Sequence, residues 1–130
     1  MSRRSQITMT EDEVREFIKS SRTMILVTNG NNGFPHPMPM WFGVEESGDV
    51  VMTTFRKSQK VLNIKRDNRV TLLVESGDAY AELKSVLIYA KAHIVDDLEA
   101  TTEALMTVSR TRGEISGAAG MSLRCLKATD

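Results

Sequence analysis

Three prolines at alternate positions, Pro35, Pro37 and Pro39, constrain the fold more than any other feature of this sequence. Alternate residues of a β-strand direct their backbone groups to the same neighbour, so a strand through these prolines lacks every N–H on one side. That side cannot donate to a β-ladder. The strand must therefore be an edge, a bulge, or a wall against something other than another strand.

Large apolar side chains follow the prolines. Met38, Met40 and Trp41 predict an apolar face suited to a flat ring, because methionine adapts its shape and tryptophan stacks. An ordinary edge strand protected by proline, with the methionines and Trp41 in the core or in a dimer interface, explains the same residues. Both interpretations stay open on this evidence.

A second feature, the stretch 50–69, predicts a phosphate site. An apolar strand leads into a helix opened by Ser58, a preferred N-cap residue. Free backbone N–H groups and the helix dipole favour an anion there. The side chains that can donate to phosphate oxygens are Thr53, Thr54, Ser58, Lys57 and Lys60. The alternative is a capped surface helix whose basic residues form a solvated face.

Composition narrows the class of protein. With 130 residues, 41% hydrophobic and 26% charged, the chain predicts one soluble domain over residues 1–130. A formal net charge of zero argues against binding to nucleic acid or to an anionic membrane. Cys125 is the sole cysteine, which excludes an intrachain disulfide and a cysteine-rich metal site.

Location is predicted from the same composition. A single cysteine fits a reducing compartment. No apolar run approaches the ~20 residues that cross a bilayer, and the start MSRRSQITMT lacks the apolar core of a secretory signal. These features predict a cytoplasmic protein without a membrane or metal partner.

Local patterns predict a mainly β chain with flanking helices. Thr10 and Glu13 form a capping box before a helix over 11–20. The turn sequences NGNNG, ESGD and SGD separate β-rich segments that predict a closed antiparallel sheet. The expected strands are 23–28, 34–44, 50–55, 70–75 and 82–95, with further helices over 58–66 and from 96 onward. Residues 113–130 predict an irregular or truncated end.

The order of motifs resembles a known family. LVTNGNNGFPHPMPMWF, followed by TTFRKSQKVLNIKRDNRVTLLVESGDAYAELKSV, is similar to the pyridoxamine 5'-phosphate oxidase-like split β-barrel proteins, which bind FMN or the deazaflavin coenzyme F-420. The resemblance runs from about Thr10 to Val95. It implies a homodimer of six-stranded antiparallel split barrels with a cofactor at each end of the interface. The residues do not distinguish FMN from F-420.

The resemblance also implies site residues. Those that match the family's positions around the phosphate-bearing tail are Thr53, Thr54, Lys57, Ser58, Gln59 and Lys60. Those that match the strand beside the tricyclic ring are Met38, Pro39, Met40 and Trp41. Lys84 and Ser85 fall where the partner subunit contributes. The implied activity is a flavin- or deazaflavin-dependent oxidoreductase that reduces a small, conjugated, apolar acceptor.

Two departures from the family limit this function. Pyridoxamine phosphate oxidases hold substrate phosphate with a basic residue at the end of the second strand, where this chain has Phe42, and with a C-terminal Arg and His that it lacks. Pyridoxal phosphate synthesis is therefore not expected. The family's last strand is also unrecognisable in 117–130, which is short and contains several Ala and Gly residues.

No catalytic acid or base is identified from the sequence. His36 is the titratable residue near the expected ring site, and a solvent-facing strand histidine is the alternative. Because the cofactor performs the hydride chemistry in such sites, no residue pattern demands turnover. A non-catalytic carrier or sensor that binds flavin or haem is thus the alternative function.

Overall fold

The computed structural model describes residues 8–96, 98–112 and 121–127. Its elements, in chain order, are α2 (Glu11–Ser20), β1 (Thr23–Asn29), β2 (Pro35–Trp41), β3 (Gly43–Val44), β4 (Val50–Thr54), α3 (Gln59–Arg66), β5 (Arg69–Ser76), the 3-10 turn η1 (Tyr80–Glu82), β6 (Lys84–Val95), α4 (Leu98–Arg112) and β7 (Met121–Lys127).

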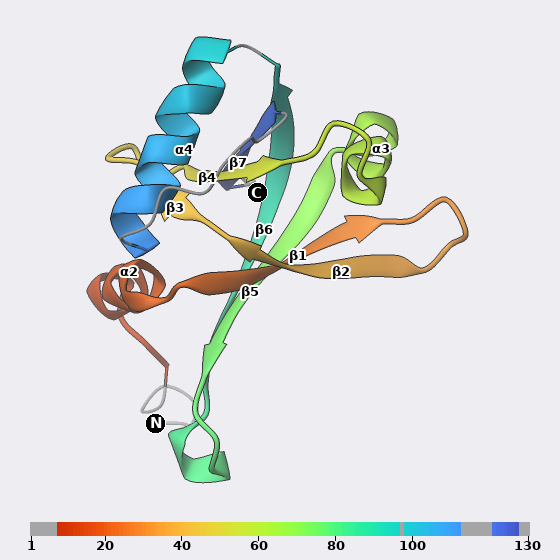
Figure 1. Ribbon diagram of the computed structural model, residues 1–130. Coiled ribbons are helices and arrows are strands. Elements are labelled where there is room, and N and C mark those ends of the chain that lie inside the picture. The colour runs from red at the N-terminus through yellow and green to blue at the C-terminus, as the bar shows by residue number, and fades with distance from the viewer. Residues whose placement is uncertain (1–7, 97, 113–120, 128–130) are drawn as a thin grey trace.

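The strands form one curled antiparallel sheet in the order β2-β1-β5-β6-β7-β4-β3 (Figure 1). Its two edge strands, β2 and β3, are separated in the chain by Phe42 alone. β2 pairs with β1, whereas β3 pairs with β4, so the two ends of the sheet meet at this residue. The curled sheet confirms the expected split-barrel class.

The strand count differs from the expected six because the predicted strand 34–44 is divided. Phe42 is fully buried in the core between β2 and β3, and the pairing changes partner on either side of it. The prolines explain why β2 ends the sheet, since Pro35, Pro37 and Pro39 present no N–H to a second neighbour. Of the alternatives that the prolines allowed, the structure shows the edge.

Residues 121–127 correct the expectation of an irregular end. They form β7, which pairs with β6 and β4 and joins the two halves of the sheet. The remaining residues of the predicted irregular segment, 113–120 and 128–130, lie outside the described residues. Cys125 of β7 is buried, and burial raises the pKa of its thiol to about 12.

The core lies inside the curl. Met24, Leu26, Met52, Leu72 and other residues of alternate strand positions are buried there, as period-two patterning requires. Helix α2 begins at the predicted capping box, with Thr10 Oγ1 accepting from the Glu13 N–H and Glu13 Oε1 accepting from the Thr10 N–H, each at 3.2 Å.

The β5–η1–β6 hairpin extends away from the body of the sheet (Figure 1). Gly77 turns the chain there with a φ of +101°, and a Cβ at this position would collide with the Glu82 carbonyl. Only glycine fits this turn without strain. The hairpin thus carries the start of β6 beyond the core.

Candidate functional site

The predicted phosphate residues are continuous in the chain, from the end of β4 into the first turn of α3. Ser58 is the N-cap residue, as expected, but its side chain does not cap the helix. Instead Ser58 Oγ donates to the Phe55 carbonyl at 2.9 Å and lies 3.4 Å from Thr54 Oγ1. The first helical hydrogen bonds come from the N–H groups of Val61 and Leu62, so those of Gln59 and Lys60 precede the helical ladder.

Lys60 is the unusual member of this segment. The residue is only 9% exposed, yet within the described residues its ammonium forms no hydrogen bond or ion pair. Burial lowers the pKa of Lys60 below its ordinary value, because a desolvated cation is disfavoured. A largely buried lysine in the first turn of a helix, in the same segment as the hydroxyls of Thr54 and Ser58, supplies the kinds of donor that bind phosphate.

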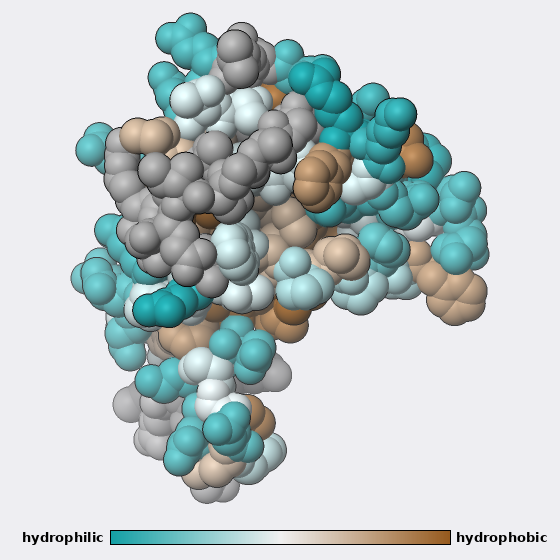
Figure 2. Space-filling view, in the orientation of Figure 1, coloured by the Kyte–Doolittle hydropathy of each residue, from teal (hydrophilic) through white to brown (hydrophobic). Residues whose placement is uncertain are grey.

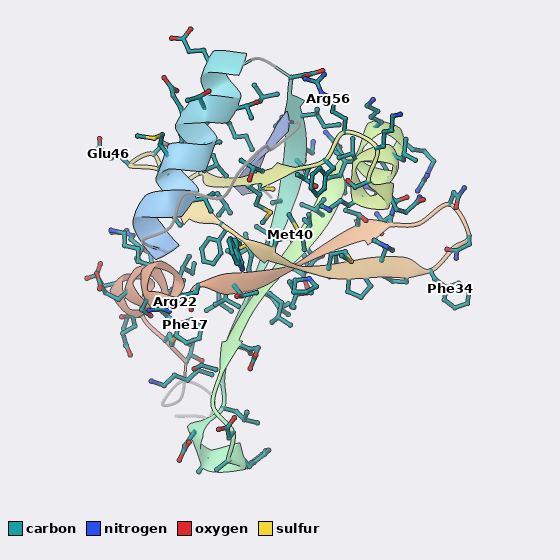
Figure 3. All side chains as sticks on the ribbon, in the orientation of Figure 1. Phe17, Arg22, Phe34, Met40, Glu46 and Arg56 are labelled. Atoms are coloured by element: carbon teal, nitrogen blue, oxygen red, sulfur yellow. The ribbon has the colours of Figure 1, made fainter. Side chains whose placement is uncertain are left out.

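The other basic residues of the segment differ from Lys60. Lys57 is exposed, and Arg56 forms an ion pair with Asp96 at 2.7 Å. This pair fastens the β4–α3 loop to the end of β6, where Figure 3 also shows Arg56. Thr53 is half-buried and Thr54 is buried. The basic residues of this segment therefore differ: Arg56 fastens the loop to Asp96, Lys57 is exposed, and Lys60 is largely buried.

Gln59 lies in the same helical turn, but the structure gives its side chain a partner within the fold. Gln59 Nε2 donates to Asn63 Oδ1 at 2.9 Å. Asn63 is fully buried and donates through Nδ2 to Thr28 Oγ1 of β1 at 3.0 Å. Sequence reasoning missed Asn63 and Thr28, although a polar residue on the apolar face of a helix was a usable signal for Asn63.

The expected ring strand has two faces rather than one. Its exposure alternates, so that Pro39 and Trp41 lie on the exposed side while Met38 and Met40 are half-buried on the other side. Met40 packs against the hydrophobic core and lies within the curl (Figure 3). The prediction that the methionines and Trp41 share one apolar face is wrong, because residues 40 and 41 point to opposite sides of a strand.

His36 lies on the half-buried side of β2. Its Nδ1 is buried and has no hydrogen-bond partner among the described residues, which is uncommon for a buried polar atom. This position differs from a solvent-facing strand histidine.

Lys84 and Ser85 begin β6 and are exposed. They lie on the protruding hairpin at the bottom of Figure 1, whereas α3 lies at the upper right of the same view. The structure of one chain therefore does not bring these two residues to the β4–α3 loop.

Two general features of the described residues bear on the site. They contain no group of three or more His, Cys, Asp or Glu side chains suited to hold a metal ion. Among the helices that the structure describes, none is long and apolar enough to cross a membrane.

Comparison with known proteins places this geometry in a family. The family model described as pyridoxamine 5'-phosphate oxidase matches residues 10–122. A conserved hypothetical protein from Mycobacterium tuberculosis has a similar structure, with a TM-score of 0.86 and 31% identity over 99% of this chain and 87% of that one. Among proteins with curated descriptions, none matches the chain.

Two more distant structures share the fold. The FAD-binding protein from Mycobacterium smegmatis has a TM-score of 0.71 and 20% identity, over 93% of this chain and 91% of that one. The haem storage protein HutZ from Vibrio cholerae has a TM-score of 0.73 and 17% identity, over 95% and 93%. The matched family model covers β1 to β6, both edge strands and the β4–α3 loop, so the chain belongs to the pyridoxamine 5'-phosphate oxidase family.

Proposed function

We propose that the β4–α3 loop binds the phosphate-bearing tail of FMN or coenzyme F-420, and that the protein is an oxidoreductase for a conjugated, apolar acceptor. The observation that carries the proposal is Lys60, a largely buried lysine without a counter-ion among the described residues. An unpaired buried cation is costly, and a phosphate would compensate it with a charge-assisted hydrogen bond.

The groups around Lys60 support an anion of this kind. The hydroxyls of Thr54 and Ser58 lie 3.4 Å apart, and the N–H groups of Gln59 and Lys60 lie at the helix start. Hydroxyl and N–H donors together suit the several oxygens of a phosphate group. Lys57, exposed on the same loop, adds positive charge at the rim.

Strand β2 is the second part of the proposed site. It contacts β4, the strand that leads into the loop, so a ligand anchored at the loop reaches β2. Pro39 and Trp41 offer apolar surface on its exposed side, and Met38 and His36 are half-buried on its other side. A bound flavin or deazaflavin would supply the hydride chemistry, while these residues bind, orient and exclude water.

Phe42 limits which substrates the proposed site is expected to accept. This side chain is fully buried in the core, so it offers no charge to a substrate phosphate. We therefore expect pyridoxamine 5'-phosphate to be a poor substrate, and quinones or similar conjugated molecules to be better ones.

A homodimer completes the proposal. The strand register places Pro39, Ile25, Leu73 and Leu87 in one row across β2, β1, β5 and β6, with Tyr89 in the adjacent row. Leu87 and Tyr89 are 58% and 67% exposed. Hydrophobic side chains also reach the surface where β1, β2 and β5 cross (Figure 2). A second copy would cover this apolar face, and its hairpin would bring Lys84 and Ser85 to a shared site.

The phosphate site is tested by comparing Lys60→Ala with Lys65→Ala, an exposed lysine of the same helix. Loss of a charge-assisted contact costs about 1.5 to 3 kcal/mol, which weakens cofactor binding roughly tenfold to a hundredfold. We expect this loss for Lys60→Ala and little change for Lys65→Ala. Equal titration curves of the two variants with FMN and with F-420 would remove the proposed site.

The absorption spectrum of the cofactor released from the purified protein distinguishes FMN from F-420. Turnover of quinones against pyridoxamine 5'-phosphate, at saturating cofactor, then tests the substrate class. Efficient oxidation of pyridoxamine 5'-phosphate contradicts the proposal. A bound cofactor that is inert to every donor and acceptor favours a non-catalytic flavin or haem carrier, a role consistent with a haem storage protein among the similar folds.

Solution mass tests the dimer. Leu87→Lys should convert the dimer to a monomer and weaken cofactor binding, because it places a charge in the covered row. The control is Leu62→Lys, at an exposed leucine of α3 outside that row. A wild-type monomer at micromolar concentration with cofactor bound is incompatible with a shared site.

A further inference from the structure

A chain of hydrogen bonds, buried at its centre, links the start of α3 to strands β1 and β2. Gln59 Nε2 donates to Asn63 Oδ1 at 2.9 Å, and Asn63 Nδ2 donates to Thr28 Oγ1 at 3.0 Å. Thr28 Oγ1 in turn donates to the His36 carbonyl at 3.5 Å. The chain therefore spans three elements, and its Asn63–Thr28 bond joins residues 35 positions apart in the sequence.

Its central members are removed from water. Asn63 and Thr28 are both 0% exposed, and each polar atom of their side chains has a partner in the chain. Removing one partner would leave a buried group unsatisfied, which is more costly than the hydrogen bond itself. A fully satisfied buried network holds its members in one arrangement.

A second set of hydrogen bonds also joins α3 to β1. Arg66, at the end of α3, donates to the Asn29 carbonyl of β1 and approaches Asn63 Oδ1 at 3.5 Å. Helix α3 is thus fixed to the end of β1 through Asn63 and Arg66, and Gln59 of its first turn is joined to this anchor through its bond to Asn63. The first turn is the one that carries Lys60 and the N–H groups of the proposed phosphate site.

We propose that Thr28 is a positioning residue for phosphate recognition. Through Asn63 and Gln59 its hydroxyl fixes the first turn of α3, so that Lys60 and the helix N–H groups face the phosphate while β2 keeps its register beside them. This inference rests on the proposed function of the β4–α3 loop. It assigns a role to a buried strand residue that does not itself contact the ligand.

The test uses Thr28→Val, which removes the hydroxyl with little change in shape, and Thr28→Ser, which keeps it. Thr28→Cys supplies a weaker donor and acceptor, in case the valine variant fails to fold. Thr23→Val, an exposed change at the other end of β1, is the matched control. The probes are FMN and riboflavin, because riboflavin lacks only the phosphate.

We expect Thr28→Val to lower the preference for FMN over riboflavin by about three- to tenfold. Thr28→Cys should give a smaller loss, and Thr28→Ser and Thr23→Val should retain the wild-type preference. A structural defect alone would weaken both ligands in parallel and leave their ratio unchanged. An unchanged ratio in the folded valine variant, or in the cysteine variant if valine prevents folding, overturns the proposal.

A second measurement separates this inference from the proposed function. In the protein without ligand, the amides of Val61 and Leu62 bond to the Ser58 carbonyl and report on the first turn of α3. Their hydrogen exchange should accelerate in Thr28→Val relative to amides of β5, and recover in Thr28→Ser. Unchanged exchange contradicts the positioning role. Accelerated exchange in a protein whose wild type binds FMN and riboflavin equally supports the role in α3 and refutes the phosphate site.

Discussion

Arg124 and Lys60 are two basic residues in different regions of the molecule. Both are shielded from water, but their surroundings are opposite. Arg124 of β7 donates to both carboxylate oxygens of Glu45, at 2.5 and 2.7 Å, and to Asp49 at 3.0 Å. Lys60 of α3 is more deeply buried, and no described carboxylate pairs with it. The first arrangement is complete within the chain, whereas we propose that an anion from outside completes the second.

We infer from this difference that Arg124 has a structural role and that Lys60 has a role in binding. The hydrogen bonds to Glu45 raise the pKa of Arg124, while burial lowers that of Lys60. Arg124 fastens the β3–β4 turn to β7 and so holds the closing strand of the sheet. If Lys60 is the proposed binding cation, it lowers the stability of the free protein.

The largest expected effect concerns Cys125, a third buried ionisable group, which stays neutral instead of finding a partner. A thiol with a pKa of about 12 rather than 9.0 forms about a thousandfold less thiolate at neutral pH. Alkylation by iodoacetamide at pH 8 should therefore be at least that much slower in the folded protein than in urea. Loss of Arg124 should accelerate alkylation by freeing β7, and loss of Lys60 should not.

Equal rates of Cys125 alkylation in the Arg124 and Lys60 variants would contradict the proposed difference between these two cations. They would mean that Arg124 does not hold β7. Rapid labelling of the wild type would show that β7 opens regardless of its ion pairs.

The next effect is on stability. Arg124→Met leaves the half-buried carboxylates of Glu45 and Asp49 without their cation, and we expect it to lower the free energy of unfolding by about 2 kcal/mol. The control is Arg15→Met, because Arg15 forms exposed ion pairs on α2 that contribute little. Urea unfolding measures both. A loss no larger than that of Arg15→Met would mean that the Arg124 cluster is a surface contact.

The sequence predicted features set by neighbouring residues better than features set by contacts between residues far apart in the chain. The capping box placed α2 at its observed bounds, and Ser58 placed the start of α3. Both signals consist of residues within one helical turn. The edge position of β2 also followed from local chemistry, because proline lacks an N–H whatever its neighbours are.

What sequence reasoning missed depends on contacts between distant residues. Arg124 and Glu45 are 79 positions apart, and β7 is stabilised by pairing with β4 and β6 rather than by its own pattern. Thr28 and Asn63 are 35 apart, and neither residue type by itself indicates burial. The candidate residues of the β4–α3 loop could be proposed from the sequence because they are consecutive, but the hydrogen bonds of Asn63 with Gln59 and Thr28 could not.

The smallest expected effect tests whether Lys60, unlike Arg124, is unpaired in the folded protein. Replacing this lysine by methionine, which keeps the length of the side chain without the charge, should raise the free energy of unfolding of the ligand-free protein by about 1 kcal/mol. The sign is opposite to that expected for Arg124→Met. We expect the free energy of unfolding to rise because burying a methionine side chain desolvates no charge.

The pH dependence gives the same test a second readout. The folded-state pKa of Lys60 lies below its ordinary value of 10.5, so between these two values the unfolded chain binds more protons than the folded one. The stability contributed by this group therefore rises with pH through that window, as the folded lysine loses its charge. Lys60→Met should remove this rise, and Lys65→Met should keep it. If Lys60→Met instead destabilises the free protein, and the slope with pH persists, then Lys60 has a partner within the fold and its role as a binding cation is refuted.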